Sequence, residues 1–155
     1  MEIVIHPIGV AHTPIKTKEE APIQGAHRPE LTGVIEVDPA YAEGLQDIEQ
    51  FSHLILLYYF DRAGEVELLR TPFLDDNPHG IFACRHPCRP NGIGITVVKL
   101  LERSGNKLVV AGVDVLDGTP VIDIKPYVPS FDCYPDASEG WLEGKKGRQK
   151  PAGRE

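Results

Sequence analysis

The sequence lacks the marks of a membrane or secreted protein. No apolar run is long enough to cross a bilayer, because the most hydrophobic stretch, residues 54–60, ends at Asp61. The N-terminus has neither the basic start nor the cleavage site of a signal peptide. Cysteine is scarce and odd in number (Cys84, Cys88 and Cys133), so we expect free thiols and no disulfide framework. These absences predict a cytoplasmic protein with no membrane partner.

Positive charge is scarce as well. The 155 residues include 16 Lys and Arg against 23 Asp and Glu, which gives a net charge of -7. This balance argues against a surface coated in positive charge for nucleic acid, but it allows a local basic patch. Residues 145–150 form such a patch in the sequence, with Arg154 beyond them. We expect one domain over residues 1–135 and a poorly ordered, solvated tail over residues 136–155.

Short strands and tight turns dominate what is present. Asp38 and Pro39 form a good helix start, and the apolar spacing after them predicts a helix to about Glu49. Gly105 and Gly118 mark two tight turns. We expect the stretch 51–60 to be a central strand buried on both faces. Other strands are expected at 3–12, 31–37, 66–69, 81–83, 93–102, 107–114 and 121–124. The pattern predicts a mainly β protein, a single irregular β-barrel with one short helix.

Residues 84–92 form a stiff, arginine-bearing loop between two apolar stretches. Pro87 and Pro90 restrict its backbone, while Gly92 permits conformations that other residues resist. The loop holds Arg85 and Arg89, whose guanidinium groups suit phosphate, carboxylate or a stacked base. The alternative is a tight connection whose arginines face water. Two arginines in one rigid loop favour a ligand site.

Other motifs indicate a function less specifically. Cys84, His86 and Cys88 could be zinc ligands, but their spacing is uncommon for zinc and neighbours on an extended chain point apart, so we expect no metal. A cysteine nucleophile lacks an assignable base. The turn at residues 117–120 exposes backbone groups that can pair with a flat heterocycle such as adenine, although it could be a simple hairpin turn. Lys125 and Tyr127 follow a strand end, where they could line a site or face solvent.

Four segments, at residues 8–14, 51–54, 80–94 and 116–127, resemble the TrmO (YaeB/TsaA-like) family. The resemblance extends over about residues 3–135, in order and at compatible spacing. It implies a homodimeric β-barrel enzyme that uses S-adenosylmethionine to methylate tRNA. The methyl group would go to N6 of a threonylcarbamoyl-adenosine beside the anticodon. A non-catalytic module that binds S-adenosylmethionine or a nucleotide is the alternative.

The resemblance also implies which residues form the site. The cofactor-binding residues would be Pro22, Ile23, Gln24, Asp61, Arg62, Arg85, Ile95, Asp117, Gly118, Thr119 and Pro120. Arg89, Lys125 and Tyr127 would bind the substrate, with the basic groups meeting RNA phosphate or the threonyl carboxylate. The catalytic base is not identified, and Asp114 and Asp123 are its candidates.

Overall fold

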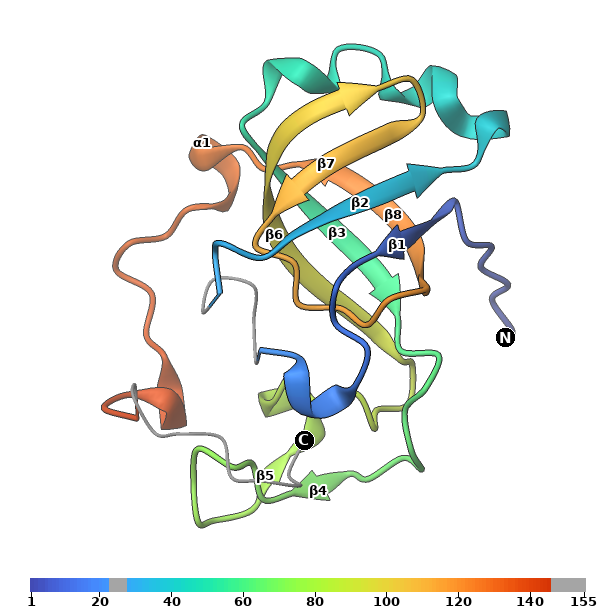
Figure 1. Cartoon of the computed structure of the whole chain (residues 1–155). Coiled ribbons are helices and arrows are strands. Elements are labelled where there is room, and N and C mark those ends of the chain that lie inside the picture. The colour runs from blue at the N-terminus through green and yellow to red at the C-terminus, as the bar shows by residue number, and fades with distance from the viewer. Residues whose placement is uncertain (23–27, 146–155) are drawn as a thin grey trace.

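A closed barrel of six strands forms the body of the protein (Figure 1). The computed structural model describes residues 1–22 and 28–145. Neighbouring strands are antiparallel and follow the order β1-β2-β7-β6-β3-β8. The strands are β1 (Gly9–His12), β2 (Thr32–Val37), β3 (His53–Tyr59), β6 (Ile93–Ser104), β7 (Lys107–Ala111) and β8 (Thr119–Pro126). The expected mainly β barrel is confirmed.

The barrel interior is filled by the inward-facing side chains of alternate residues, as a small barrel requires. Its fully buried members include Ile35, Leu54, Val98, Leu108, Val110 and Val121. The prediction that β3 is buried on both faces is wrong. Leu54, Leu56 and Tyr58 point inward, whereas Ile55 and Leu57 are only partly covered. A barrel strand has just one interior face, so the outward apolar residues remain on the surface.

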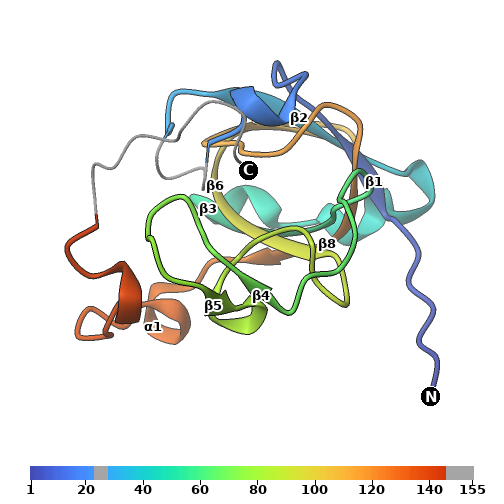
Figure 2. The same cartoon turned by 90° about the horizontal axis from the view of Figure 1, so that it is seen from below.

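A small second lobe lies beyond one end of the barrel (Figures 1 and 2). It contains the two-stranded sheet of β4 (Leu69–Arg70) and β5 (His79–Gly80), followed by η5 (Ile81–Ala83). The strand expected at 81–83 is therefore wrong: the amide of Cys84 donates to the carbonyl of Ile81 and closes a 3-10 turn. The strand expected at 66–69 is present only at its last residue.

The N-terminal strand is shorter than expected. β1 begins at Gly9 rather than Ile3, and residues 1–7 are exposed and outside any strand. Pairing starts where the chain meets β2 closely: a Cβ on Gly9 would lie 2.3 Å from the carbonyl oxygen of Glu36. Glycine is therefore required at this contact.

The expected helix between β2 and β3 is also different. Two 3-10 helices, η3 (Pro39–Leu45) and η4 (Ile48–Gln50), replace the α-helix. Asp38 caps the first as predicted, accepting from the amide of Ala40 at 2.9 Å. Asp47 then takes a left-handed conformation (φ 70°), which interrupts the helical path. Three further short helices were not expected: η1 (Lys18–Glu20), α1 (Pro129–Asp132) and η6 (Gly140–Leu142).

Both predicted tight turns are confirmed. Gly105 (φ 61°) joins β6 to β7, and Gly118 (φ 84°) precedes β8. The two turns lie at opposite ends of the barrel, with the Gly118 turn at the end that carries the β4–β5 lobe (Figure 1).

Across the described residues, no helix has the length and apolar character needed to cross a membrane.

Candidate functional site

The turn before β8 is the centre of the candidate site. The amide and hydroxyl of Thr119 both donate to the carbonyl of Leu116, at 3.1 and 2.6 Å. Gly118 occupies the third position with φ 84°, a conformation that a type II turn requires and that favours glycine. These bonds hold the turn in a defined shape.

Backbone contacts fix this turn to the segment that follows β1. The amide of Asp117 donates to the carbonyl of Ile15 at 2.8 Å, and the amide of Gly118 donates to the carbonyl of Ala11 at 2.8 Å. Two segments about a hundred residues apart in the chain therefore form one rigid corner.

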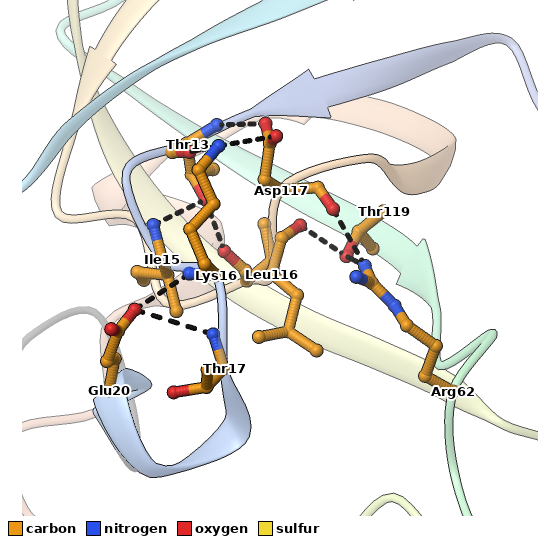
Figure 3. Close-up of polar contacts among 10 residues, drawn as sticks. Thr13, Ile15, Lys16, Thr17, Glu20, Arg62, Leu116, Asp117 and Thr119 are labelled. Atoms are coloured by element: carbon orange, nitrogen blue, oxygen red, sulfur yellow. Dashed lines mark hydrogen bonds and ion pairs between the residues drawn. The ribbon is translucent and has the colours of Figure 1, made fainter.

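The Asp117 carboxylate strengthens this corner (Figure 3). It accepts from the amide of Thr13 at 3.0 Å and from the Lys16 ammonium group at 2.6 Å. The hydrogen bond from Lys16, followed by that from Thr13, lowers the pKa of Asp117. The carboxylate is therefore ionised at neutral pH and supplies a fixed negative charge at the corner.

Arg62 joins a third segment to the turn, as Figure 3 shows. Its Nη2 donates to the carbonyl of Asp117 at 2.9 Å and to the Thr119 hydroxyl at 3.2 Å. Its Nε donates to the carboxylate of Asp61 at 3.3 Å. The structure thus brings together two sets of residues predicted for the cofactor, the 61–62 pair and the 117–119 turn.

Arg85 lies near the same end of the barrel. Burial raises the pKa of the Tyr58 hydroxyl, the negative charge of Asp114 raises it further, and the positive charge of Arg85 opposes both effects. Arg85, Asp114 and Tyr58 therefore share one electrostatic neighbourhood. Tyr58 pairs with Val121 on β8, two residues beyond Thr119. Asp114 is a buried carboxylate with 7% of its surface exposed.

Arg89 contacts the backbone of its own loop. Its Nη1 lies 2.9 Å from the carbonyl of Cys84 and 3.3 Å from those of Ile81 and His86. These contacts brace the arginine loop, so that it can present Arg85. Substrate binding by Arg89 stays a prediction.

Other predicted residues lie farther from the corner. Ile95 is on the outer face of β6, opposite Leu57, and is 39% exposed. Lys125 lies near the far end of β8, about 20 Å along the strand from Thr119 at the usual rise per residue, and Tyr127 follows the end of the strand. Within one chain they do not meet the corner. Pro22 is partly buried, and Ile23 and Gln24 lie outside the described residues.

Lys125 and the cysteines have local roles. Lys125 pairs with Asp123 at 2.8 Å, and this hydrogen bond raises the pKa of Lys125. Burial raises the pKa of the Cys84 thiol, which disfavours the reactive thiolate. In residues 1–22 and 28–145, no three His, Cys, Asp or Glu side chains gather as metal ligands would.

A shallow, open cleft of about 400 Å³ borders the corner on its other side, a size within the range of small-molecule sites. Asp117 and Lys16 form one wall, and the outer surface of β1, β2 and β7 forms the rest. Its lining residues are His12, Thr13, Pro14, Lys16, Thr32, Gly33, Val34, Val109 and Asp117.

Sequence reasoning missed the roles of Thr13, Lys16 and Tyr58. Thr13 lies in one of the segments that resemble the TrmO family, but the sequence alone does not indicate that it contacts Asp117. Lys16 and Asp117 are 101 positions apart, and no local pattern predicts their pairing.

Comparison with known proteins identifies the family of the chain. Residues 10–133 match the family model of the tRNA-methyltransferase O N-terminal domain. A protein of Pyrococcus abyssi named as a probable S-adenosyl-L-methionine-binding protein is 51% identical over 141 residues, covering 91% of this chain and 77% of its own. An S-adenosyl-L-methionine-binding protein of Archaeoglobus fulgidus is 43% identical, covering 84% of this chain and 94% of its own.

The chain is also similar to enzymes with longer chains, of which it covers only a part. The mouse tRNA (adenine(37)-N6)-methyltransferase is 41% identical over 91 residues, which are 57% of this chain and 21% of the mouse protein. A crystal structure of TrmO superposes with a TM-score of 0.80 at 39% identity, covering 90% of this chain and 64% of the other. TrmO from Pseudomonas aeruginosa superposes with a TM-score of 0.77 at 38% identity, and this chain spans 63% of its length. From the extent of the family match and the common fold, we conclude that the chain belongs to the TrmO family.

Proposed function

We propose that this protein is an S-adenosylmethionine-dependent methyltransferase that acts on N6 of threonylcarbamoyl-adenosine beside the anticodon of tRNA. Family membership and relatives named as S-adenosylmethionine-binding proteins support the cofactor. The name of the mouse relative supports a tRNA adenine as the substrate. The observation that carries the proposal is the corner in which Arg62 binds both Asp117 and Thr119.

The corner suits a cofactor that combines adenine, a sulfonium and an amino acid. Its backbone carbonyl oxygens, each with two lone pairs, can accept from the amino group of an adenine ring, and its carboxylates can meet positive charge. Asp117 and Asp61 supply carboxylates; Lys16 and the amide of Thr13 orient that of Asp117, and Arg62 orients that of Asp61. Bound S-adenosylmethionine supplies an electrophilic methyl group. The residues around it contribute mainly by positioning, which is the chief demand of an in-line displacement.

The adenine nitrogen must lose a proton as its new bond to carbon forms. Of the two carboxylates considered from the sequence, Asp123 is paired with Lys125 on the outer surface of β8. Asp114 is buried near Tyr58 and Arg85, at the end of the barrel that holds the corner. We therefore assign Asp114 as the proton acceptor, and Arg85 as the group that binds the threonyl carboxylate or a phosphate.

A homodimer is part of the proposal. The outer face of β6 exposes Ile93, Ile95 and Val97, which lie opposite Tyr59, Leu57 and Ile55 of β3. Adjacent outward-facing apolar side chains on two paired strands are typical of a surface that another subunit covers. A second copy seated there would cover Ile95 and could bring its own Lys125 and Tyr127 toward the first copy's corner.

The test is methyl transfer with a defined product. Purified protein is incubated with labelled S-adenosylmethionine and tRNA that carries threonylcarbamoyl-adenosine, and the nucleosides are separated by mass spectrometry. We expect one methyl group on the modified adenine. Cofactor binding by calorimetry without transfer to any tRNA would instead favour the non-catalytic binding module that some relatives' names describe.

A further inference from the structure

A buried carboxylate attaches the segment at residues 140–145 to the β4–β5 lobe. Asp75 has only 6% of its surface exposed. Its Oδ1 accepts from Nζ of Lys145 at 2.6 Å, and its Oδ2 lies 2.7 Å from Nε2 of His79. The hydrogen bond from Lys145, followed by that from His79, lowers the pKa of Asp75, so the carboxylate is ionised at neutral pH. Groups 70 positions apart in the chain therefore meet at one fixed point.

Trp141 joins the same segment to the lobe a second time. Its ring stacks on His79, with the centroids 4.5 Å apart and the planes at 13°. Its indole Nε1 donates to the carbonyl oxygen of Ala83 at 2.8 Å. The stack restrains the ring and so fixes the direction of this hydrogen bond. Trp141 lies beyond residue 133, where the family match ends, so the contact comes from outside the matched domain.

The acceptor of this hydrogen bond belongs to the backbone that leads directly into Arg85. Ala83 is the last residue of η5, and its carbonyl and the amide of Cys84 form one planar peptide unit. Trp141 holds the oxygen of that unit, while the Cys84 amide donates to the carbonyl of Ile81 at 3.2 Å. Both polar groups of this peptide unit are therefore held.

The next peptide unit, between Cys84 and Arg85, is held by Arg89. Its Nη1 donates to the carbonyl oxygen of Cys84 at 2.9 Å. Two successive peptide planes before Arg85 are thus fixed, one from within the arginine loop and one by Trp141. Because each peptide unit is rigid, the position of the Arg85 Cα depends on both contacts.

We propose that Trp141 is a positioning residue for Arg85, which it holds where the arginine binds the anionic group of the RNA substrate. This inference rests on the proposed function. Trp141 acts through the loop, by limiting the arrangements that the loop can adopt. A site that is correctly arranged only part of the time has an apparent affinity reduced by that fraction. Loss of the indole hydrogen bond should therefore weaken binding of tRNA by about two- to tenfold.

The first experiment removes the hydrogen bond and keeps the aromatic stack. Trp141→Phe retains a ring that can stack on His79 but has no N–H group. We expect KM for tRNA to rise about two- to tenfold, with kcat and S-adenosylmethionine affinity unchanged. The control is Leu142→Ala, which shortens an exposed side chain of the same turn and leaves the Ala83 contact in place. It should leave KM unchanged.

The second experiment asks whether Trp141 acts through Arg85. Trp141→Phe is placed on Arg85→Ala, and Kd for tRNA is measured by filter binding, which needs no turnover. If the effect passes through Arg85, Trp141→Phe should add nothing to the Kd of Arg85→Ala. A general effect on the lobe would add in full.

Hydrogen exchange gives a third readout, which needs no substrate. The Cys84 amide is held by Ile81 within the peptide unit that Trp141 fixes. It should exchange about two- to tenfold faster in Trp141→Phe than in the unaltered protein or in Leu142→Ala. Thermal unfolding confirms that each variant is folded.

The outcomes separate the two proposals. If the unaltered protein transfers no methyl group to tRNA, the proposed function and this inference both fail. If it methylates tRNA, three results would each overturn the inference alone. They are an unchanged KM in Trp141→Phe, full additivity with Arg85→Ala, and unchanged exchange of the Cys84 amide.

Discussion

The turn before β8 can be tested with a pair of matched glycine substitutions. Gly118 and Gly105 both have positive φ, at 84° and 61°, and a Cβ on either would have no heavy atom within 4 Å. Alanine at each position therefore brings backbone strain and no steric clash. The two turns lie at opposite ends of the barrel, so Gly105→Ala is the control for Gly118→Ala.

The expected cost in stability is similar for both variants. A non-glycine residue in the left-handed region costs roughly 1–2 kcal/mol, and alanine offsets about 0.4–1 kcal/mol of this by restricting the unfolded chain. A net loss of about 1 kcal/mol lowers Tm by about 2–4 °C for a domain of this size. Thermal unfolding followed by circular dichroism measures this change.

Cofactor binding should separate the two variants. Relief of the strain at residue 118 rotates the peptide unit that presents the Asp117 carbonyl to Arg62 and the Gly118 amide to Ala11. The displaced turn should lose about one hydrogen bond to the cofactor, and a cost of about 0.5–1.5 kcal/mol corresponds to a two- to tenfold weaker affinity. Calorimetry with S-adenosylmethionine should show this loss in Gly118→Ala and not in Gly105→Ala. Equal affinities in the two variants would refute the assignment of the turn to the cofactor site.

Four further predictions follow from the site. Arg62→Lys keeps the positive charge but lacks the planar guanidinium that donates to both Asp117 and Thr119. Calorimetry should therefore show about tenfold weaker cofactor binding, and an unchanged affinity would count against a role for these two hydrogen bonds. Asp114→Asn should abolish methyl transfer but retain cofactor binding, and full activity would exclude it as the proton acceptor. The folded-state pKa of Asp117 is lowered, so the ionised carboxylate stabilises the folded protein. This stabilisation is complete above the ordinary pKa of 3.8 and is lost as the pH falls through the lowered folded-state pKa. Asp117→Asn should therefore destabilise the protein to urea at pH 7 and progressively less below pH 3.8; a deficit that does not depend on pH would contradict this. Ile95→Glu should shift a dimer to monomer by light scattering, whereas Val66→Glu, on another exposed apolar residue, should not.

Local chemistry in the sequence predicted those parts of the fold that depend on a few neighbouring residues. The turns at Gly105 and Gly118 and the cap at Asp38 were predicted because glycine and aspartate favour one backbone arrangement there. The helix after Asp38 was misjudged because its apolar spacing suits an α-helix, while the left-handed Asp47 breaks the path. Residue 81 was misjudged because a buried isoleucine fits a short 3-10 turn as well as a strand.

Only separate parts of the candidate site were predictable from the sequence. The arginine loop and the Asp-Gly turn each stood out, but nothing local indicates that Arg62 would join the turn to Asp61. Arg89 illustrates the opposite problem: its residue type suits a ligand, yet its guanidinium contacts three carbonyls of its own loop. Contacts of long sequence separation arise from barrel closure, and a single sequence carries no pattern for them.

The location of the bound cofactor tests the central claim most directly. A crystal structure with S-adenosylhomocysteine, the product that remains after methyl transfer, would place the ligand relative to every residue discussed. We expect its density against the turn at residues 117–120, within contact of Arg62 and near Arg85. Density confined to the cleft over Gly33, or elsewhere with the turn untouched, would contradict the proposed site.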